Sequence, residues 1–373
     1  MPELAAVFRG AGVAYRVAFE GRMPPSHTRA MEDIVLCRTP ALGGSVYACD
    51  ACGTLAYSYH SCRNRHCPKC QHDRAQTWLD KLRARLLPCD HYLLTFTLPQ
   101  PLRAIARAHQ RAVYDSLLRE AAGSIQTLAA DPQWLGARPA MLAVLHTWSR
   151  TLAYHPHAHL LVTAGGLAPD GVSWRKPTHS RFLVPGYALS QVFRAKMRDA
   201  LTRQDLAHLT DPRVWRIPWT VHVKHIGNGH QAALYLSRYV YRVAISNDRI
   251  EAFSQDRVTF RYTDGRTRET RRMTLPAQDF IGRFLQHVLP RRFSKIRYYG
   301  LLSPAAADDL ATARRLLLAA ADSVEATSEC DRRAVPPLST DPTASAPPAP
   351  LCPACGTGYL RLEHSNRRTR APP

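Results

Sequence analysis

The sequence is short of acidic residues and has no long apolar run. Its 373 residues include 29 Asp and Glu against 50 Lys and Arg, which gives a formal net charge of +21 and a pI near 10.0. No apolar run reaches the roughly 18 residues that a membrane span needs. The first residues lack the basic segment, apolar core and small-residue cleavage site of a secretory signal. These absences lead us to expect a cytosolic protein with no membrane partner.

The excess of positive charge points to a polyanionic partner. Nucleic acid fits better than a lipid surface, because no amphipathic basic helix or lipidation signal is present. A generally basic protein from a GC-rich genome, whose codons favour arginine, is the alternative explanation. The 45% hydrophobic content is enough to bury a sizeable core, which we expect to divide into two or three units.

Cysteine is plentiful, and in a reducing compartment ten cysteines suggest metal ligands before disulfides. The knuckles Cys49-x-x-Cys52 and Cys67-x-x-Cys70 can each present two thiolates from a tight turn. We therefore predict that these four cysteines bind one structural Zn²⁺. The neighbouring residues that could complete a second zinc site are Cys37, Cys62, His60 and His66.

Basic residues crowd the second knuckle and suit a surface that contacts phosphates; they are Arg63, Arg65 and Lys69. From Ser303 onward the composition shifts to Ala, Pro, Ser and Thr, which predicts a flexible tail. A lone Cys352-x-x-Cys355 knuckle lies near its end. Although Cys330 or His364 could complete a site there, we expect no ordered site.

Hydrophobic periodicity predicts an alternation of helices and strands. Helices are expected over 71–87, 102–128, 189–208 and 230–243, and strands over 91–99, 141–148, 157–163 and 219–225. Residues 258–299 suggest short strands, turns and one helix.

The stretch HPHAHLLV at 155–162 places histidines at alternate positions ahead of an apolar run. On a strand, His157 and His159 would point to the same face about 7 Å apart, where two rings can share one metal ion. Pairing with the preceding strand would place His146 across from His159. Solvated histidines at a strand end are the alternative.

Tyr235 and Tyr239 lie one turn apart on the predicted helix at 230–243. Tyrosines that merely border a core are the alternative. Together with a pair of metal-binding histidines, a helical tyrosine is the minimal equipment for cutting single-stranded DNA through a phosphotyrosine link. Rejoining from that link needs no ATP, and the sequence contains no GxxxxGK[ST] motif.

An ordered set of motifs resembles the HUH tyrosine transposases of the insertion sequence 91 type. The set comprises SCRNRHCPKCQ, TFTLP, LHTW, HPHAHLLVTAGGL, YLSRYVYRVAISNDRI, VTFRYTD and FLQHVLPRRFSKIRYYGLL, and extends to about Leu302. The resemblance implies that His157 and His159 bind a catalytic Mg²⁺ or Mn²⁺ and that Tyr235 and Tyr239 are the nucleophiles. His146 and His225 are candidates for a third metal ligand, and some relatives of this type work with one tyrosine. Tyr241 departs from the pattern as a third tyrosine.

The expected fold class is α+β, with the ferredoxin-like antiparallel palm of HUH enzymes behind an N-terminal zinc-binding module. We expect a zinc module with a basic helix over 1–88, a catalytic and DNA-binding domain over 89–302, and the tail over 303–373. Further DNA-binding candidates are Arg238, Arg242, Arg291, Arg292, Lys295 and Arg297.

The resemblance also implies an activity and a location. The chain would bind single-stranded or hairpin ends of a mobile element, nick them and transfer strands by a rolling-circle route. We expect it in the bacterial cytoplasm, at the nucleoid. A plasmid replication initiator or relaxase is one alternative, and a catalytically dead, zinc-dependent DNA-binding regulator is another. The sequence leaves the oligomeric state open.

Overall fold

A five-stranded antiparallel sheet lies at the centre of the computed structural model, which describes residues 2–179, 182–228, 231, 243–325 and 349–367. Its strand order is β12-β4-β5-β3-β8. The strands are β3 (Asp90–Thr97), β4 (Ala140–Trp148), β5 (Tyr154–Thr163), β8 (Val221–Asn228) and β12 (Ile296–Gly300). Nearly every residue of β4 is buried, as expected for a central strand covered on both faces.

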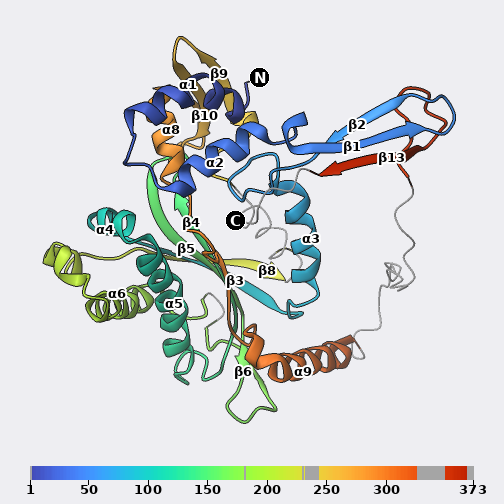
Figure 1. The fold of residues 1–373 in the computed structure, drawn as a ribbon. Coiled ribbons are helices and arrows are strands. Elements are labelled where there is room, and N and C mark those ends of the chain that lie inside the picture. Colours follow the sequence, from blue (N-terminus) through green and yellow to red (C-terminus); the bar gives the residue numbers. More distant parts are fainter. Residues whose placement is uncertain (1, 180–181, 229–230, 232–242, 326–348, 368–373) are drawn as a thin grey trace.

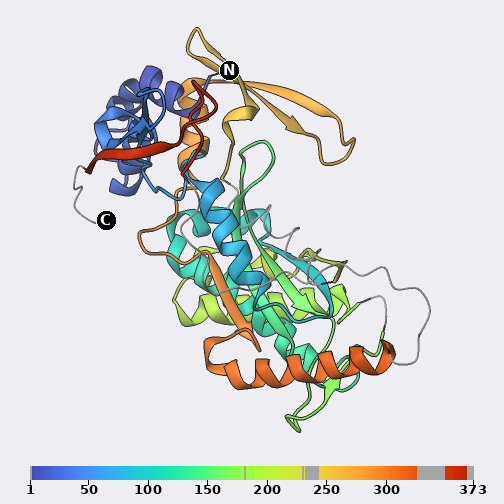
Figure 2. The ribbon, with the colours of Figure 1, turned by 90° about the vertical axis from the view of Figure 1, so that its right-hand side faces the viewer.

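Helices cover both faces of this sheet (Figures 1 and 2). One face packs on α4 (Arg103–Ala108), α5 (Gln110–Ala129) and α6 (Gly186–Arg203) through a core that includes Tyr92, Phe96 and Phe193. The other face packs on α3 (Gln71–Arg83) and α9 (Ala307–Glu325). In chain order β3, α5, β4, β5, α6 and β8 form a βαββαβ unit.

A second layer contains the N-terminal helices α1 (Leu4–Ala18) and α2 (Pro25–Leu36), at the top of Figure 1. They share a core with α8 (Ala277–Leu285) and with the sheet formed by β9 (Ile250–Ser254), β10 (Arg257–Thr263) and β11 (Thr270–Pro276). The rings of Phe8 and Phe284 meet edge to face within this core. A two-stranded ribbon, β6 (Gly166–Leu167) and β7 (Trp174–Arg175), follows β5.

A three-stranded arm extends away from the central sheet at the upper right of Figure 1. It consists of β1 (Gly43–Cys49), β2 (Leu55–Tyr59) and β13 (Leu360–Arg367), in the order β13-β1-β2. Its outer strands therefore come from opposite ends of the sequence. The six short 3-10 helices of the described chain lie at Pro40–Leu42, Gln100–Leu102, Ala207–Leu209, Pro212–Trp215, Asn247–Arg249 and Pro304–Ala306.

The flexible tail expected over 303–373 is wrong where α9 and β13 form, and residues 326–348 lie outside the described residues. On α9, Ala313 is fully buried under the central sheet, and Arg314 donates a hydrogen bond to the Ala84 carbonyl. The β13 strand pairs with β1 along its length. Composition misled the prediction because an alanine-rich segment forms a good helix as readily as a linker. Among the described residues, no helix is long and apolar enough to cross a membrane.

Most predicted elements lie close to the observed ones, but α9 and the arm strands β1, β2 and β13 were not predicted. The helix expected over 102–128 breaks at His109, whose φ of -118° and ψ of 50° separate α4 from α5. The N-terminal helices α1 and α2 were not predicted. The helix predicted over 230–243, with its tyrosines, lies almost entirely outside the described residues.

Candidate functional site

Three histidines converge on one face of the central sheet. His146 at the end of β4 pairs directly with His157 at the start of β5, and His159 lies two residues further along. One ring nitrogen from each lies within 4.8 Å of the others. The ring centroids of His146 and His159 are 4.8 Å apart, and those of His157 and His159 are 4.9 Å apart. This spacing lets three imidazoles bind one cation.

Hydrogen bonds hold two of these rings from behind. The Nδ1–H of His157 donates to the His155 carbonyl at 2.6 Å, which fixes the tautomer whose Nε2 carries a lone pair. A 3.0 Å hydrogen bond joins Nδ1 of His159 to the Thr95 hydroxyl. Metal-binding histidines are typically oriented in this way through their second nitrogen. The donor set therefore fits a divalent cation.

Burial keeps His157 and His159 neutral, which is the form that binds metals. It lowers the pKa of His157 to about 4, and it lowers the pKa of His159 to about 3, with the nearby His157 adding to the shift. His146 is only 3% exposed. Its ring stacks on Trp148 with centroids 4.8 Å apart.

The structure favours one of the two candidates for the third ligand. His146 joins the cluster, although it pairs with His157 and not with His159 as predicted. A shift of two residues keeps the same face, so the predicted proximity holds. His225 does not join, because it pairs with Tyr92 of the opposite core and hydrogen-bonds to Asp90 at 3.1 Å.

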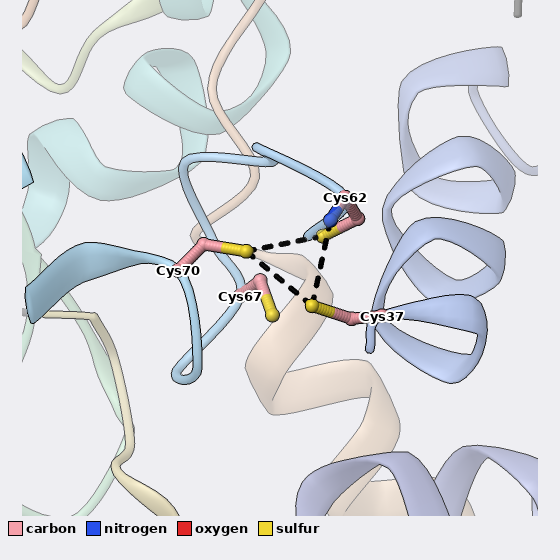
Figure 3. Close-up of side chains that lie close together, drawn as sticks. All are labelled: Cys37, Cys62, Cys67 and Cys70. Atoms are coloured by element: carbon pink, nitrogen blue, oxygen red, sulfur yellow. Dashed lines mark hydrogen bonds between the residues drawn. The ribbon is translucent and has the colours of Figure 1, made fainter. Parts of the chain in front are cut away.

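Four cysteines form a second cluster at the junction of α2, the arm and α3 (Figure 3). They are Cys37, Cys62, Cys67 and Cys70, and their sulfurs lie within 4.8 Å of one another. The Sγ of Cys70 is 3.4 Å from that of Cys37 and 3.6 Å from that of Cys62. All nine cysteines among the described residues are free of disulfides. Their thiolates suit tetrahedral zinc.

This grouping corrects the predicted quartet of Cys49, Cys52, Cys67 and Cys70. Cys37 and Cys62 flank the base of the β1–β2 hairpin, where the His60 N–H donates to the Gly43 carbonyl at 3.0 Å. Cys49 and Cys52 lie at its tip, a strand length of roughly 20 Å away. There the structure places them beside Cys352 and Cys355, a knuckle expected to be isolated.

Neither histidine proposed for the second zinc site contributes to a cysteine cluster. His66 accepts a hydrogen bond from the Leu289 N–H at 3.3 Å, and burial lowers its pKa well below the usual value. His60 extends from the hairpin base outside both cysteine groups. Asn64 stabilises the turn before Cys67 instead, because it donates a hydrogen bond to Asp33 and accepts one from the His66 N–H.

Some of the predicted DNA-binding residues are exposed, and others form ion pairs or hydrogen bonds within the protein. Arg63, Arg291 and Arg292 are exposed. Lys69 pairs with Glu3 at 2.6 Å and Arg297 pairs with Asp115. Arg65 donates to the Phe293 carbonyl, and burial lowers the pKa of Lys295 to about 8. Arg238 and Arg242 lie outside the described residues, as do Tyr235, Tyr239 and Tyr241.

A basic cleft was missed by the sequence interpretation. It has a volume of about 840 Å³ and lies between the N-terminal helices, the α4–α5 junction and α8. Arg22, Arg107 and Arg111 line it, and no Asp or Glu does so in the described part of the chain. One turn before Arg107 on α4, Arg103 donates to His155, which lies two residues before His157 on β5. The clue in the sequence was the regular spacing of arginines along 103–111.

Comparisons with known proteins agree on one family. Residues 7–98 match a family described as "Transposase zinc-binding domain", and residues 140–309 match one described as "Putative transposase". "Putative transposase y4qJ" of Sinorhizobium fredii is 41% identical over 81% of this chain and 80% of its own length. "Transposase for insertion sequence element IS801" of Pseudomonas savastanoi pv. phaseolicola is 31% identical over 76% of this chain and 72% of its own.

No solved structure matches the chain. The zinc-binding match includes the whole cluster of Cys37, Cys62, Cys67 and Cys70, and the second match includes all three clustered histidines. Both relatives are named as transposases, which disfavours a plasmid replication initiator or relaxase. The chain belongs to the transposases of the insertion sequence 91 type.

Proposed function

We propose that this transposase is an HUH endonuclease that nicks single-stranded ends of its mobile element and transfers the strands by a rolling-circle route. The observation that carries the proposal is the convergence of His146, His157 and His159 at the end of two paired strands. The surrounding βαββαβ unit has the strand order β4-β5-β3-β8, which suits the ferredoxin-like palm of such enzymes.

The three imidazoles would hold Mg²⁺ or Mn²⁺. Such an ion, when bound, polarises the scissile phosphate and offsets the negative charge that develops on its oxygens. The sheet itself contributes orientation: His157 is held by its own strand and His159 by Thr95. The ligands are thus fixed before DNA arrives, which lowers the cost of assembling the site.

Tyr235 and Tyr239 are the proposed nucleophiles. A tyrosine hydroxyl loses its proton, and its oxygen bonds to phosphorus while the bond from phosphorus to the 3' oxygen breaks. The 3' oxygen takes up a proton and becomes the free 3' hydroxyl of one DNA end, and the other end stays linked to the tyrosine through its 5' phosphate. That link conserves the energy of the phosphodiester, so a 3' hydroxyl can later reverse the step without ATP. With two tyrosines, one can remain linked while the other cuts again.

The basic cleft is the proposed path of the DNA backbone. Arg22, Arg107 and Arg111 present positive charge without a lining carboxylate among the described residues, and Arg291 adjoins the cleft because its carbonyl accepts from Arg111. Arg103 adds a further positive charge near the start of β5, where it donates to the neutral ring of His155. Single strands or hairpin ends of the element could therefore contact the cleft through phosphates and reach the sheet edge.

We further propose that Cys37, Cys62, Cys67 and Cys70 bind the structural Zn²⁺ of the N-terminal module. Cys37, Cys67 and Cys70 are buried in the core shared by α1, α2 and α8. One ion there would fix the base of the arm against that core. The protein would act on DNA in the bacterial cytoplasm, at the nucleoid.

The proposal is tested by incubating the purified protein with a labelled single strand of an element end and Mg²⁺ or Mn²⁺. We expect a covalent protein–DNA band on a denaturing gel, together with a product that has a free 3' hydroxyl. Retained DNA binding without any cleavage product would support a catalytically dead regulator instead.

A further inference from the structure

Four cysteines from opposite ends of the chain meet at the tip of the arm. Cys49 and Cys52 lie where β1 turns into β2, and Cys352 and Cys355 precede β13. The Sγ atoms of Cys49 and Cys355 are 3.7 Å apart, and those of Cys52 and Cys352 are 3.8 Å apart. Tetrahedral zinc with Zn–S bonds of about 2.3 Å separates its sulfurs by about 3.8 Å. We propose that these four cysteines bind one further Zn²⁺, which joins the C-terminal segment to the N-terminal module.

The two halves of this site have nearly the same sequence and the same turn. Residues 49–54 are CDACGT and residues 352–357 are CPACGT. In each, the glycine adopts a positive φ, 70° at Gly53 and 69° at Gly356, and its N–H donates to the carbonyl of the first cysteine. Cys67-x-x-Cys70 lacks this glycine and belongs to the other cluster. The matching turns identify Cys49/Cys52 and Cys352/Cys355 as the two halves of one site.

Backbone donors point at the sulfurs, as a thiolate site requires. The N–H groups of Ala51 and Cys52 each lie 3.4 Å from Cys49 Sγ. On the other half, the Gly358 N–H lies 3.4 Å from Cys355 Sγ. These contacts stabilise negative charge on sulfur, since a hydrogen bond to an ionised acceptor is stronger than one to a neutral acceptor.

Contacts beside the cysteines hold the segment before β13 against the β1–β2 hairpin. The Tyr359 N–H and the Arg361 guanidinium both donate to Asp50, at 2.7 and 3.1 Å. A Cβ on Gly358 would lie 2.5 Å from Cys49 Sγ, so only glycine permits this approach. The C-terminal segment therefore packs closely on the N-terminal hairpin beside the cysteines, through both backbone and side-chain contacts.

Half of this site lies outside the residues that match the two transposase families. Both family matches, 7–98 and 140–309, end before Cys352. Cys49 and Cys352 are buried, Cys355 is half-buried and Cys52 is exposed, so the ion would be shielded on one side and open to solvent on the other. The ligand class is a thiophilic divalent cation, and its role is to hold β13 on β1 as the third strand of the arm. This inference does not depend on the proposed cleavage chemistry.

Zinc counting in the full-length chain tests the assignment, in a His157→Ala/His159→Ala background that removes the imidazole site. We expect two Zn²⁺ per chain before substitution. Cys352→Ser/Cys355→Ser should lose one, Cys49→Ser/Cys52→Ser should lose one, and the four substitutions together should still lose only one because both pairs share it. Cys89→Ser is the matched control, since Cys89 lies outside both clusters, and should lose none.

The inference is overturned if Cys352→Ser/Cys355→Ser keeps both ions, or if the four substitutions together remove two.

A second experiment tests the junction without measuring the zinc content. A protease site inserted between Glu325 and Pro350 allows the C-terminal segment to be cut from the purified protein. We expect the fragment to co-purify with the body until a strong zinc chelator releases it, and the Cys352→Ser/Cys355→Ser fragment to dissociate at least tenfold more readily. Equal retention of both fragments would contradict a zinc-dependent junction.

Discussion

His146, His157 and His159 differ from the other histidines of the described chain in that their ring nitrogens meet at one place. Two of the rings are oriented by hydrogen bonds to their second nitrogen. At neutral pH, burial keeps His157 and His159 uncharged, so no proton must leave before a cation binds. The residue types, the neutrality of His157 and His159 and the orientation of their rings support the proposed metal-binding role over solvated histidines.

Replacing any one of these histidines by alanine should reduce cleavage of single-stranded DNA by more than about a hundredfold, because the ion would be left without one of its protein ligands. DNA affinity should change little, since we propose that the binding charge lies in the basic cleft. Cleavage on a denaturing gel and binding by fluorescence anisotropy provide the two measurements.

His225→Ala is the matched control for these variants. His225 also lies on the central sheet, but it pairs with Tyr92 and hydrogen-bonds to Asp90. We expect it to retain cleavage. If His225→Ala is as inactive as His157→Ala, the three-histidine centre is the wrong assignment.

At the scale of elements, the β1–β2 hairpin and α4 place the residues whose grouping the sequence did not predict. These are the cysteines of the arm and the arginines of the basic cleft. Adjacent knuckles in the sequence suggested one shared zinc, yet the hairpin places Cys49 a strand length away from Cys67. The partner knuckle at Cys352 is 300 residues from Cys52, a distance at which spacing carries no information about contact.

By contrast, the β4–β5 hairpin and the shared face of His157 and His159 followed from alternation alone, because a strand fixes that face locally. Its register was missed by two residues, since the pairing shifts between His146 and Trp148.

Cys67→Ser should remove one Zn²⁺ and lower the free energy of unfolding by more than about 4 kcal/mol, since metal sites are among the few single-residue losses of that size. Cys67 is 1% exposed, in a core that also contains Leu4 and Phe284. Urea unfolding at fixed zinc concentration measures the change. Cys89→Ser should stay within about 1 kcal/mol of the parent, and an equal loss in both variants would speak against a metal site at Cys67.

The cleft beside α4 leads to a prediction about salt. Arg22→Gln/Arg111→Gln should weaken binding of single-stranded DNA and reduce the slope of log affinity against log salt by about 0.7 for each phosphate that the variant no longer neutralises. Arg138→Gln is the control, because Arg138 pairs with Asp309 outside this cleft. An unchanged slope in the double variant would place the DNA elsewhere.

Across the whole molecule, a buried polar residue as well as apolar packing links the layer that contains α8 to the central sheet. His287 is 2% exposed, contacts Thr147 at 3.2 Å through Nδ1, and donates to the Leu152 carbonyl at 3.2 Å. It thereby joins the α8 end to the β4–β5 hairpin. Burial lowers its pKa from 6.5 to about 4.

This shift predicts a pH dependence of stability. Between about 6.5 and about 4 the unfolded chain carries a proton on His287 that the folded chain does not, so the free energy of unfolding falls as pH falls through that window. The slope is at most about 1.4 kcal/mol per pH unit. Relative to His287→Gln, the parent should be more stable at pH 7, and the difference should shrink by pH 5. Urea midpoints for both proteins measure this, and parallel curves would show that His287 does not titrate as inferred.

The central claim, proposed strand cleavage by a tyrosine with the aid of the histidine centre, is tested most directly by mapping the covalent adduct. The protein is trapped on a single-stranded element end, digested, and analysed by mass spectrometry. We predict a 5'-phosphonucleotide on Tyr235 or Tyr239, an adduct from at least one of the single variants Tyr235→Phe and Tyr239→Phe, and none from the double variant. An adduct that persists in the double variant, at Tyr241 or at any other residue, would contradict the account.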